Sequence, residues 1–239
     1  MSSERPQPPT AVAPIASMDD PRVITILSTE HWSLLSARSL AYNEAFVRAG
    51  MFLTFLSMSF VALALLAQAM DFGRDFLSVT ALVLAFDLVI GLATFGRING
   101  ANYDDLRAVH GMARIRHGYT QITPLVTPYF TTPTHDDIDA VTTVYGPISA
   151  RLPGQIVYGL TTSAGMIGLI VAMVGGVLTA VVAMLVGVAG GASIWIGLLG
   201  GVAVLVALIA YGYVSVGSVQ ASVTARFPTP EMPSATDSE

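Results

Sequence analysis

Two long stretches without proline each contain a pair of apolar runs, and this pattern restricts the possible fold more than any other feature. None of the thirteen prolines lies between Pro21 and Pro124 or between Pro153 and Pro228. The four apolar runs in these stretches are 49–70, 77–96, 156–186 and 194–217. A helix of about 20 apolar residues crosses a hydrocarbon core of about 30 Å. The sequence therefore predicts an all-α integral membrane protein with four transmembrane helices arranged as two hairpins.

The composition agrees with a membrane protein and excludes several kinds of site. Hydrophobic residues make up 53% of the chain, charged residues only 11%, and the mean hydropathy is +0.66. Soluble domains carry about 25% charged residues. Cysteine is absent, which excludes disulfides, thiolate metal ligands and a cysteine nucleophile. All eleven lysine-or-arginine positions are arginine, which, with the abundance of Ala, Gly and Val, indicates a GC-rich bacterial genome.

The two ends of the chain differ from the apolar runs. Residues 1–24 are rich in proline and serine without apolar periodicity, so we expect a disordered arm and no signal peptide. Residues 25–48 have the pattern of an interfacial helix that leads into the first apolar run. Ser28 or Thr29 is the expected N-cap of this helix. Residues 218–239 form a C-terminal tail.

The segment 97–155 is the one long hydrophilic insert between the two hairpins. We expect two helices and a loop in this insert. The first helix continues from the second apolar run, and a proline-containing loop follows it. The second helix is expected to begin after Thr132 or Thr134, with Asp136 and Asp137 in its first turn, where acids complement the helix dipole.

The distribution of arginine predicts how the chain is threaded. Arg74 is the single arginine between the first two apolar runs, and none lies between the last two. The other ten lie in the N-terminal segment, the insert and the tail. Arginine accumulates on the cytoplasmic side of membrane proteins. We therefore expect both termini and the insert in the cytoplasm, with the protein in the bacterial inner membrane.

Asp87 is the one ionisable residue deep in an apolar run. An acid at this depth costs several kcal/mol unless it is neutralised or solvated, so it is a functional candidate. If the first two runs form a hairpin about Gly73, Ser57 and Ser59 lie at the same depth. Two interpretations remain open: a protonated carboxyl hydrogen-bonded to these hydroxyls, or a group that carries protons or cations.

His110, Arg114 and His117 share one face of the first predicted helix of the insert. The two histidines are two turns apart, about 10 Å along the axis, so they cannot bind one metal ion together. The alternatives are a solvated face or an anion-facing surface for lipid headgroups or a phosphorylated ligand. The anion-facing candidates are Arg97, Arg107, Arg114, Arg116, His110 and His117.

The pair His135 and Asp136 resembles the HD pair of metal phosphohydrolases, but that family needs further His and Asp ligands. Helix capping accounts for the acids without a metal. We therefore predict no metal site and no cofactor.

Small residues recur every four positions in the third apolar run, and GxxxG pairs follow. Such strips let two helix backbones approach closely in lipid. They serve packing within one chain, contact between copies, or both. The third run is also longer than a bilayer requires, so we expect it to tilt or project. The small residues are Ala164, Gly168, Ala172, Gly176 and Ala180, with the pairs Gly187/Gly191 and Gly197/Gly201.

Four blocks of sequence carry a resemblance to known proteins. They are ILSTEHWSLLSARSLAYNEAFVRAGMF, GMARIRHGY, TPLVTPYF and THDD. They resemble blocks of a family of uncharacterised bacterial four-helix membrane proteins, over about residues 25–140. The resemblance implies no activity, but it implies that these blocks act together as one unit.

Three functions are compatible with the sequence. The first is a non-enzymatic scaffold or regulatory component that self-associates, because the apolar runs are nearly free of polar residues. The second is an ion or proton conductor that uses Asp87. The third is a membrane-bound metal-dependent hydrolase built on His117, His135 and the neighbouring acids. We expect the lipid bilayer and further copies or membrane subunits as partners, and no nucleic acid.

Overall fold

The computed structural model describes residues 17–70, 72–145, 159–222 and 224–230. Within these residues every regular element is a helix, which confirms the all-α class. Most of the expected arm 1–24 and part of the insert 97–155 lie outside the described residues. The elements are α1 (Pro21–Ala69), α2 (Arg74–Ile122), the 3₁₀ helix η1 (Pro124–Tyr129), α3 (Ile138–Thr142), the 3₁₀ helix η2 (Thr143–Tyr145), α5 (Ser163–Leu185) and α6 (Gly190–Ser222).

Helix α1 is continuous, so the segments 25–48 and 49–70 are one element of 49 residues. It begins earlier than expected, because Asp20 accepts a hydrogen bond from the backbone N–H of Arg22 and Pro21 occupies the first turn. The expected cap at Ser28 or Thr29 is therefore wrong. Both hydroxyls instead donate to the carbonyl of Thr25 within the helix.

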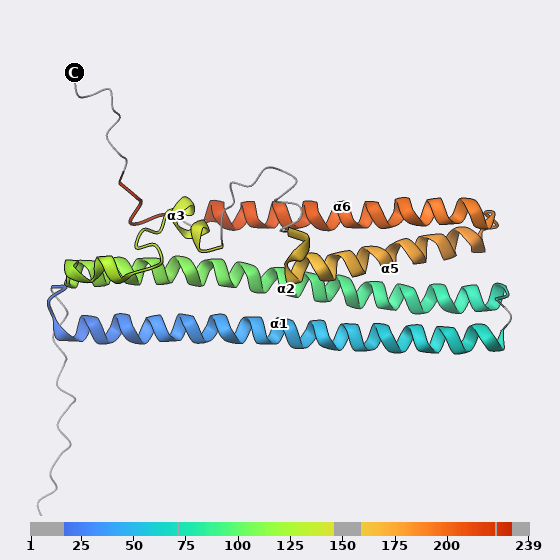
Figure 1. The fold of residues 1–239 in the computed structure, drawn as a ribbon, viewed down its shortest axis with the longest axis horizontal. Helices are drawn as coiled ribbons and strands as arrows, with labels where there is room; N and C mark the ends of the chain where they lie inside the picture. The colour runs from blue at the N-terminus through green and yellow to red at the C-terminus, as the bar shows by residue number, and fades with distance from the viewer. Residues whose placement is uncertain (1–16, 71, 146–158, 223, 231–239) are drawn as a thin grey trace, which may run out of the picture.

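Helices α1 and α2 form an antiparallel hairpin along their whole length (Figure 1). The turn contains Phe72, which has a positive φ of 52°, and Gly73, which precedes the first residue of α2. Helix α2 also has 49 residues, so it is about 74 Å long. The expected continuation of the second apolar run into the insert is confirmed, although the helix begins at Arg74 rather than at residue 77.

Helix α5 is shorter than the apolar run 156–186 from which it was predicted. The chain turns at Thr162, whose hydroxyl accepts a hydrogen bond from the N–H of Gly165 and so caps the helix. Residues 156–158 lie outside the described residues. With 23 residues, α5 matches a bilayer, and the expected overlong third span is wrong. At its other end Arg74 donates to the carbonyl of Leu185.

Small residues bring α5 and α6 together, as the four-residue spacing predicted. A Cβ atom at Gly176 would lie 2.9 Å from the carbonyl oxygen of Gly197, and one at Gly201 would lie 3.1 Å from the carbonyl oxygen of Ala172. A Cβ at Gly197 would lie 2.7 Å from the Cβ of Ala180. These strips therefore serve packing inside one chain.

The remaining small residues have other roles. Gly168 faces Phe95, which its Cβ would approach to 3.1 Å, and Ala164 is buried. The expected pair Gly187/Gly191 is not a packing motif. Gly187 adopts a φ of +91° in the turn before α6, and a Cβ at either glycine would meet no neighbour within 4 Å.

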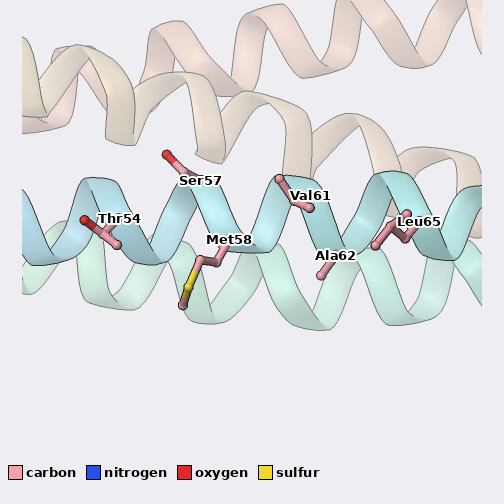
Figure 2. Close-up of a pocket in the computed structure, with 6 residues that line it drawn as sticks. All are labelled: Thr54, Ser57, Met58, Val61, Ala62 and Leu65. Carbon is pink, nitrogen blue, oxygen red and sulfur yellow. The ribbon is translucent and has the colours of Figure 1, made fainter.

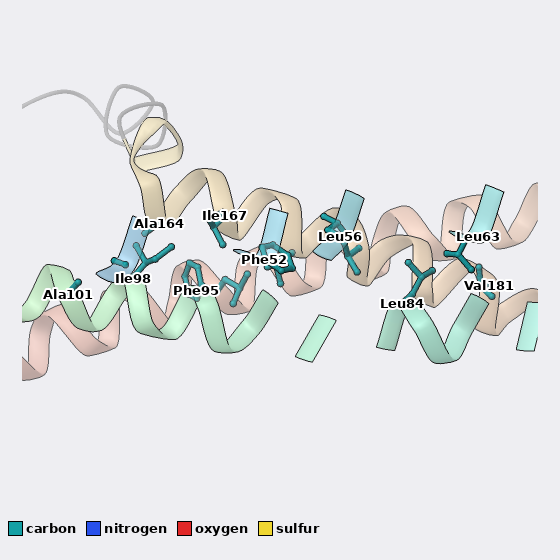
Figure 3. Packing of buried hydrophobic residues seen from close by; sticks show 14 residues of the cluster. Phe52, Leu56, Leu63, Leu84, Phe95, Ile98, Ala101, Ala164, Ile167 and Val181 are labelled. Atoms are coloured by element: carbon teal, nitrogen blue, oxygen red, sulfur yellow. The ribbon is translucent and has the colours of Figure 1, made fainter. Parts of the chain in front are cut away.

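The apolar core lies where α1, α2 and α5 meet (Figure 3). Phe52 of α1, Leu84 of α2 and Val171 of α5 are fully buried. Gly91 makes this meeting possible, since a Cβ there would lie 2.7 Å from Val171 and 2.9 Å from the ring of Phe52. Helix α2 is thus central, with α1 on one side and α5 on another, and α6 packs mainly on α5.

Helices α1, α2, α5 and α6 are each long and apolar enough to cross a membrane, which indicates a multi-pass membrane protein. Helix α6 begins at Gly190 and continues to Ser222, so it takes up the first residues of the expected tail 218–239. The long helices run nearly parallel, and α3 and the end of α6 lie in the half of the molecule that contains the start of α1 and the end of α2 (Figure 1).

Candidate functional site

The polar module, defined here as residues 17–48, 97–145 and 224–230, contains most of the charged side chains and is the candidate functional site. Two glycines of the block GMARIRHGY set how closely α1 and α2 approach in it. A Cβ at Gly111 would lie 2.8 Å from Leu34, and one at Gly118 would lie 3.0 Å from Leu27. Both ends of this block therefore pack closely against the α1 block that begins at Ile26, at Leu34 and Leu27.

Asp136 lies at the centre of the module and is fully buried. Its carboxylate accepts hydrogen bonds from Nε of Arg114 at 2.6 Å, from the backbone N–H of Arg226 at 3.0 Å and from that of Phe227 at 2.7 Å. Its own N–H donates to the carbonyl of Phe227 at 3.1 Å. The C-terminal segment 224–230 is thus bound to the loop that precedes α3.

Asp137 completes this attachment. One carboxylate oxygen accepts from the N–H of Ala140 at 3.2 Å, so Asp137 is the N-cap of α3. The other accepts from the N–H and the hydroxyl of Thr229, at 2.9 and 2.7 Å. The expected caps Thr132 and Thr134 are therefore wrong. The backbone N–H groups of the tail segment have no partner within a helix, so they donate to Asp136 and Asp137 instead.

The two acids are held in their charged form. Burial would raise the pKa of Asp136, but the N–H of Arg226, the guanidinium of Arg114 and the N–H of Phe227 outweigh burial and lower it. The pKa of Asp137 is likewise lowered, because donation from Thr229 and Ala140 outweighs its burial. Both carboxylates therefore act as charged acceptors for the tail segment.

The histidines of the module lie next to aromatic rings or are buried. His117 stacks on Phe227 of the tail segment, with ring centroids 4.1 Å apart, and lies 5.8 Å from the ring of His135. His110 is buried, and neither of its ring nitrogens has a hydrogen-bond partner. Among the described residues no group of three or more His, Asp or Glu side chains could hold a metal ion.

A second buried carboxylate joins α1, α2 and η2. Asp105 accepts a bidentate ion pair from Arg38 of α1 and a hydrogen bond of 2.7 Å from the hydroxyl of Tyr145. Burial and the neighbouring Asp105 raise the pKa of Tyr145, so its hydroxyl remains protonated. Sequence reasoning missed this site, because nothing in the local pattern indicates that residues so far apart meet.

Two of the four arginines of the expected anion-facing surface are bound to acids within the chain. Arg97 binds Glu44 at 2.8 Å, and Arg114 binds Asp136. Arg107 is exposed. Arg116 is half-buried and donates only to the carbonyl of Pro133, at 3.5 Å.

Asp87 is fully buried and accepts a hydrogen bond of 3.0 Å from the hydroxyl of Ser59. The expected hairpin about Gly73 brings these two residues to the same depth, as predicted. The second oxygen of Asp87 is buried without a partner. Ser57 does not contribute, since its exposed hydroxyl donates to the carbonyl of Leu53 on its own helix.

Ser57 lines a shallow groove on α1 instead (Figure 2). The groove has a volume of about 420 Å³. Its two hydroxyls, on Thr54 and Ser57, donate to carbonyls of α1, so the donor of each is used within the helix. The lining residues are Thr54, Ser57, Met58, Val61, Ala62 and Leu65.

Together these contacts make the polar module an assembly of its three sequence segments, held by charged hydrogen bonds. The blocks that contain Gly111, Phe130 and Asp136 all contribute, since Tyr119 also lies against Phe130 with ring centroids 6.4 Å apart. Comparison of the chain with protein-family models, curated proteins and solved structures finds no match.

Proposed function

We propose that this protein is a non-enzymatic scaffold or regulatory component of the bacterial inner membrane, which self-associates and carries the polar module in the cytoplasm. The observation that supports this most directly is the use of the module's acids. Asp105 and Asp136 are buried and bound to arginine and to other donors. A catalytic acid or base must reach the proton it transfers, and these carboxylates are occupied in holding the chain together.

The hydrolase alternative has little support in this geometry. His117 faces an aromatic ring of the tail segment, and Asp136 faces the backbone of the same segment. A metal-dependent hydrolase needs three or more ligands around one ion, with one position open for water. The described residues offer no such group.

The shared contacts of the sequence blocks support their interpretation as one unit. The GMARIRHGY block makes three sets of contacts. Its glycines pack against α1, its Tyr119 lies against Phe130 of the TPLVTPYF block, and its Arg114 binds Asp136 of the THDD block. The family resemblance is therefore proposed to describe a way of building this module rather than an active site.

The proposed threading has a direct test in a chain without cysteine. Gln121 is exposed at the end of α2, and Ala189 is exposed in the turn before α6. An impermeant thiol reagent added to intact cells should label Ala189→Cys and not Gln121→Cys. The reverse labelling would place the polar module outside the cytoplasm and contradict the proposal.

Self-association requires a surface other than the small-residue strips of α5 and α6, because those strips face each other. The outer faces of α1 and α6 present exposed apolar side chains such as Met58, Leu65, Trp195 and Leu199. Mass measurement of the protein purified in a mild detergent, with identification of the proteins that accompany it, tests the scaffold function. A strictly monomeric protein with no companion would contradict it.

One observation favours a conductor as the second candidate. Asp87 is buried between α1 and α2 with one oxygen unpartnered, and intramembrane acids often mark ion pathways. Along α2, Thr80 and Thr94 are also buried, but each lies two turns from Asp87, about 10 Å away. That spacing is too long for direct proton transfer.

A further inference from the structure

One arginine of the polar module is half-buried without a carboxylate partner. Arg38, Arg97 and Arg114 each bind an acid within the chain. Arg116 is bound only by the carbonyl of Pro133, and its 3.5 Å distance is at the upper limit of a hydrogen bond. Within the described part of the chain, four of its five N–H donors therefore have no protein acceptor.

A histidine of the facing helix α1 packs against Tyr119, three residues after this arginine on α2. His31 is on the helix face between Leu27 and Leu34, which contact Gly118 and Gly111 on either side of Arg116. Its ring lies 6.4 Å from that of Tyr119, and its Nδ1 atom is buried without a hydrogen-bond partner. His31 and Tyr119 thus lie together between α1 and α2, and Arg116, one turn before Tyr119 on α2, reaches the loop before α3 at Pro133.

The electrostatic surroundings of both groups are positive. Burial lowers the pKa of Arg116, and the charge of Arg38 lowers it further. Burial also lowers the pKa of His31, and the charge of Arg116 adds to this effect. A cation that is partly removed from water is costly unless an anion compensates it. No acid of the described residues contributes this compensation at Arg116.

We propose that Arg116 and His31 form a binding site for a soluble phosphate-type oxyanion, either free phosphate or the phosphate group of a small molecule. The guanidinium presents paired N–H donors whose planar geometry matches two oxygens of a phosphate. His31 supplies a further N–H donor from the facing helix. Binding exchanges the weak hydrogen bond to Pro133 for charge-assisted bonds.

The position along α2 separates a soluble anion from a lipid headgroup. Arg116 lies about 30 Å beyond the end of the apolar run 77–96, at 1.5 Å for each helical residue. A headgroup bound to a bilayer around that run would not reach this far. The ligand is therefore taken from solution.

The test is a titration of the purified full-length protein in detergent with sodium phosphate, followed by calorimetry, at constant ionic strength set with sodium chloride. Wild type should bind phosphate at one site. Arg116→Gln should weaken binding at least about tenfold, because a bidentate charge-assisted pair is lost. Arg107→Gln removes an exposed arginine from the same helix, and this control should bind as wild type does.

Two further variants keep the proposal open to contradiction. Arg116→Lys keeps the charge without the planar fork, so it should bind more weakly than wild type even if Arg116→Gln unfolds. His31→Gln should weaken binding several-fold. Equal binding by wild type and Arg116→Lys, or equal loss in Arg107→Gln, would overturn the site. Arg116-dependent binding to phosphatidylglycerol vesicles without binding of phosphate would also overturn it.

Discussion

The carboxylate of Asp136 accepts a 2.6 Å hydrogen bond from Nε of Arg114, and this ion pair joins α2 to the loop that leads into α3. The same carboxylate binds the backbone of Arg226 and Phe227. One buried side chain thus holds three segments that are distant in sequence. Each segment should lose order when this charge is removed.

Asp136→Asn is expected to release the tail segment 224–230. Removing one partner of a buried ion pair costs about 3 to 5 kcal/mol, and we expect the lower end because Arg114 is 36% exposed. Trypsin cleaves after exposed arginines only when the backbone is free to extend. Limited proteolysis should therefore cut after Arg226 slowly in wild type and much faster in the variant, as measured by mass spectrometry.

Asp139→Asn is the matched control for this experiment. Asp139 lies in the first turn of α3 and is exposed, and within the described residues no hydrogen bond joins its side chain to the tail segment. Its loss should leave cleavage after Arg226 unchanged. If both variants are cut as slowly as wild type, Asp136 does not hold the tail.

The same site predicts how stability depends on pH. The pKa of Asp136 is lowered in the folded protein, so its contribution is complete above the unfolded value of about 3.9. The contribution is lost as the pH falls through the still lower folded value. Melting curves between about pH 6 and pH 2.5 should therefore show wild type losing its advantage over Asp136→Asn only below about pH 4. A difference that instead grows on acidification would contradict this sign.

Periodicity and spacing were sufficient to predict the long helices and their closest contacts. The four-residue repeat of small side chains predicted the α5 and α6 contact at Gly176 and Gly197. A hairpin about Gly73 predicted the pair of Asp87 and Ser59. Both features lie between two helices joined by one short connection, so the helical period within each helix is enough to locate them.

The polar module could not be predicted in the same way. The segment THDD has the composition of a helix start, and Asp137 does cap α3. Asp136 instead binds a backbone 90 residues away, and its neighbour Asp137 binds Thr229 as well. The first turn of α1 was also missed, because Asp20 and Pro21 begin the helix before Ser28. Its continuation from residues 25–48 into the more apolar run was expected. A helix continues through such a change wherever no proline or glycine pair interrupts it and a partner helix supports it.

A methyl group added to Gly176 should destabilise the contact between α5 and α6. Its Cβ would lie 2.9 Å from the carbonyl oxygen of Gly197, and backbone cannot move aside as a flexible side chain does. Overpacking of this kind costs about 1 to 3 kcal/mol. Gly176→Ala should lower the melting temperature in detergent, whereas Gly212→Ala on α6, where a Cβ meets nothing within 4 Å, should not. Equal melting of the two variants would show that the helices separate freely.

The scaffold and the conductor differ most at Asp87. A scaffold needs only a neutral hydrogen-bonded group opposite Ser59, so Asp87→Asn should fold and assemble like wild type. Asp87→Leu removes the hydrogen bond, and in lipid such a bond contributes about 0.6 to 2 kcal/mol. We expect Asp87→Leu to melt at a slightly lower temperature, and Ser59→Ala to show a similar loss, because each variant breaks the same 3.0 Å contact.

A conductor would respond differently, because its carboxylate must exchange a proton or meet a cation. Asp87→Asn keeps the size of the side chain and its hydrogen-bonding capacity but removes the titratable proton. Vesicles that contain the protein and a pH-sensitive dye separate the two functions. We expect no flux above that of empty vesicles, either in wild type or in Asp87→Asn. Flux in wild type that disappears in Asp87→Asn, while Ser59→Ala retains part of it, would reject the scaffold and identify Asp87 as the conducting group.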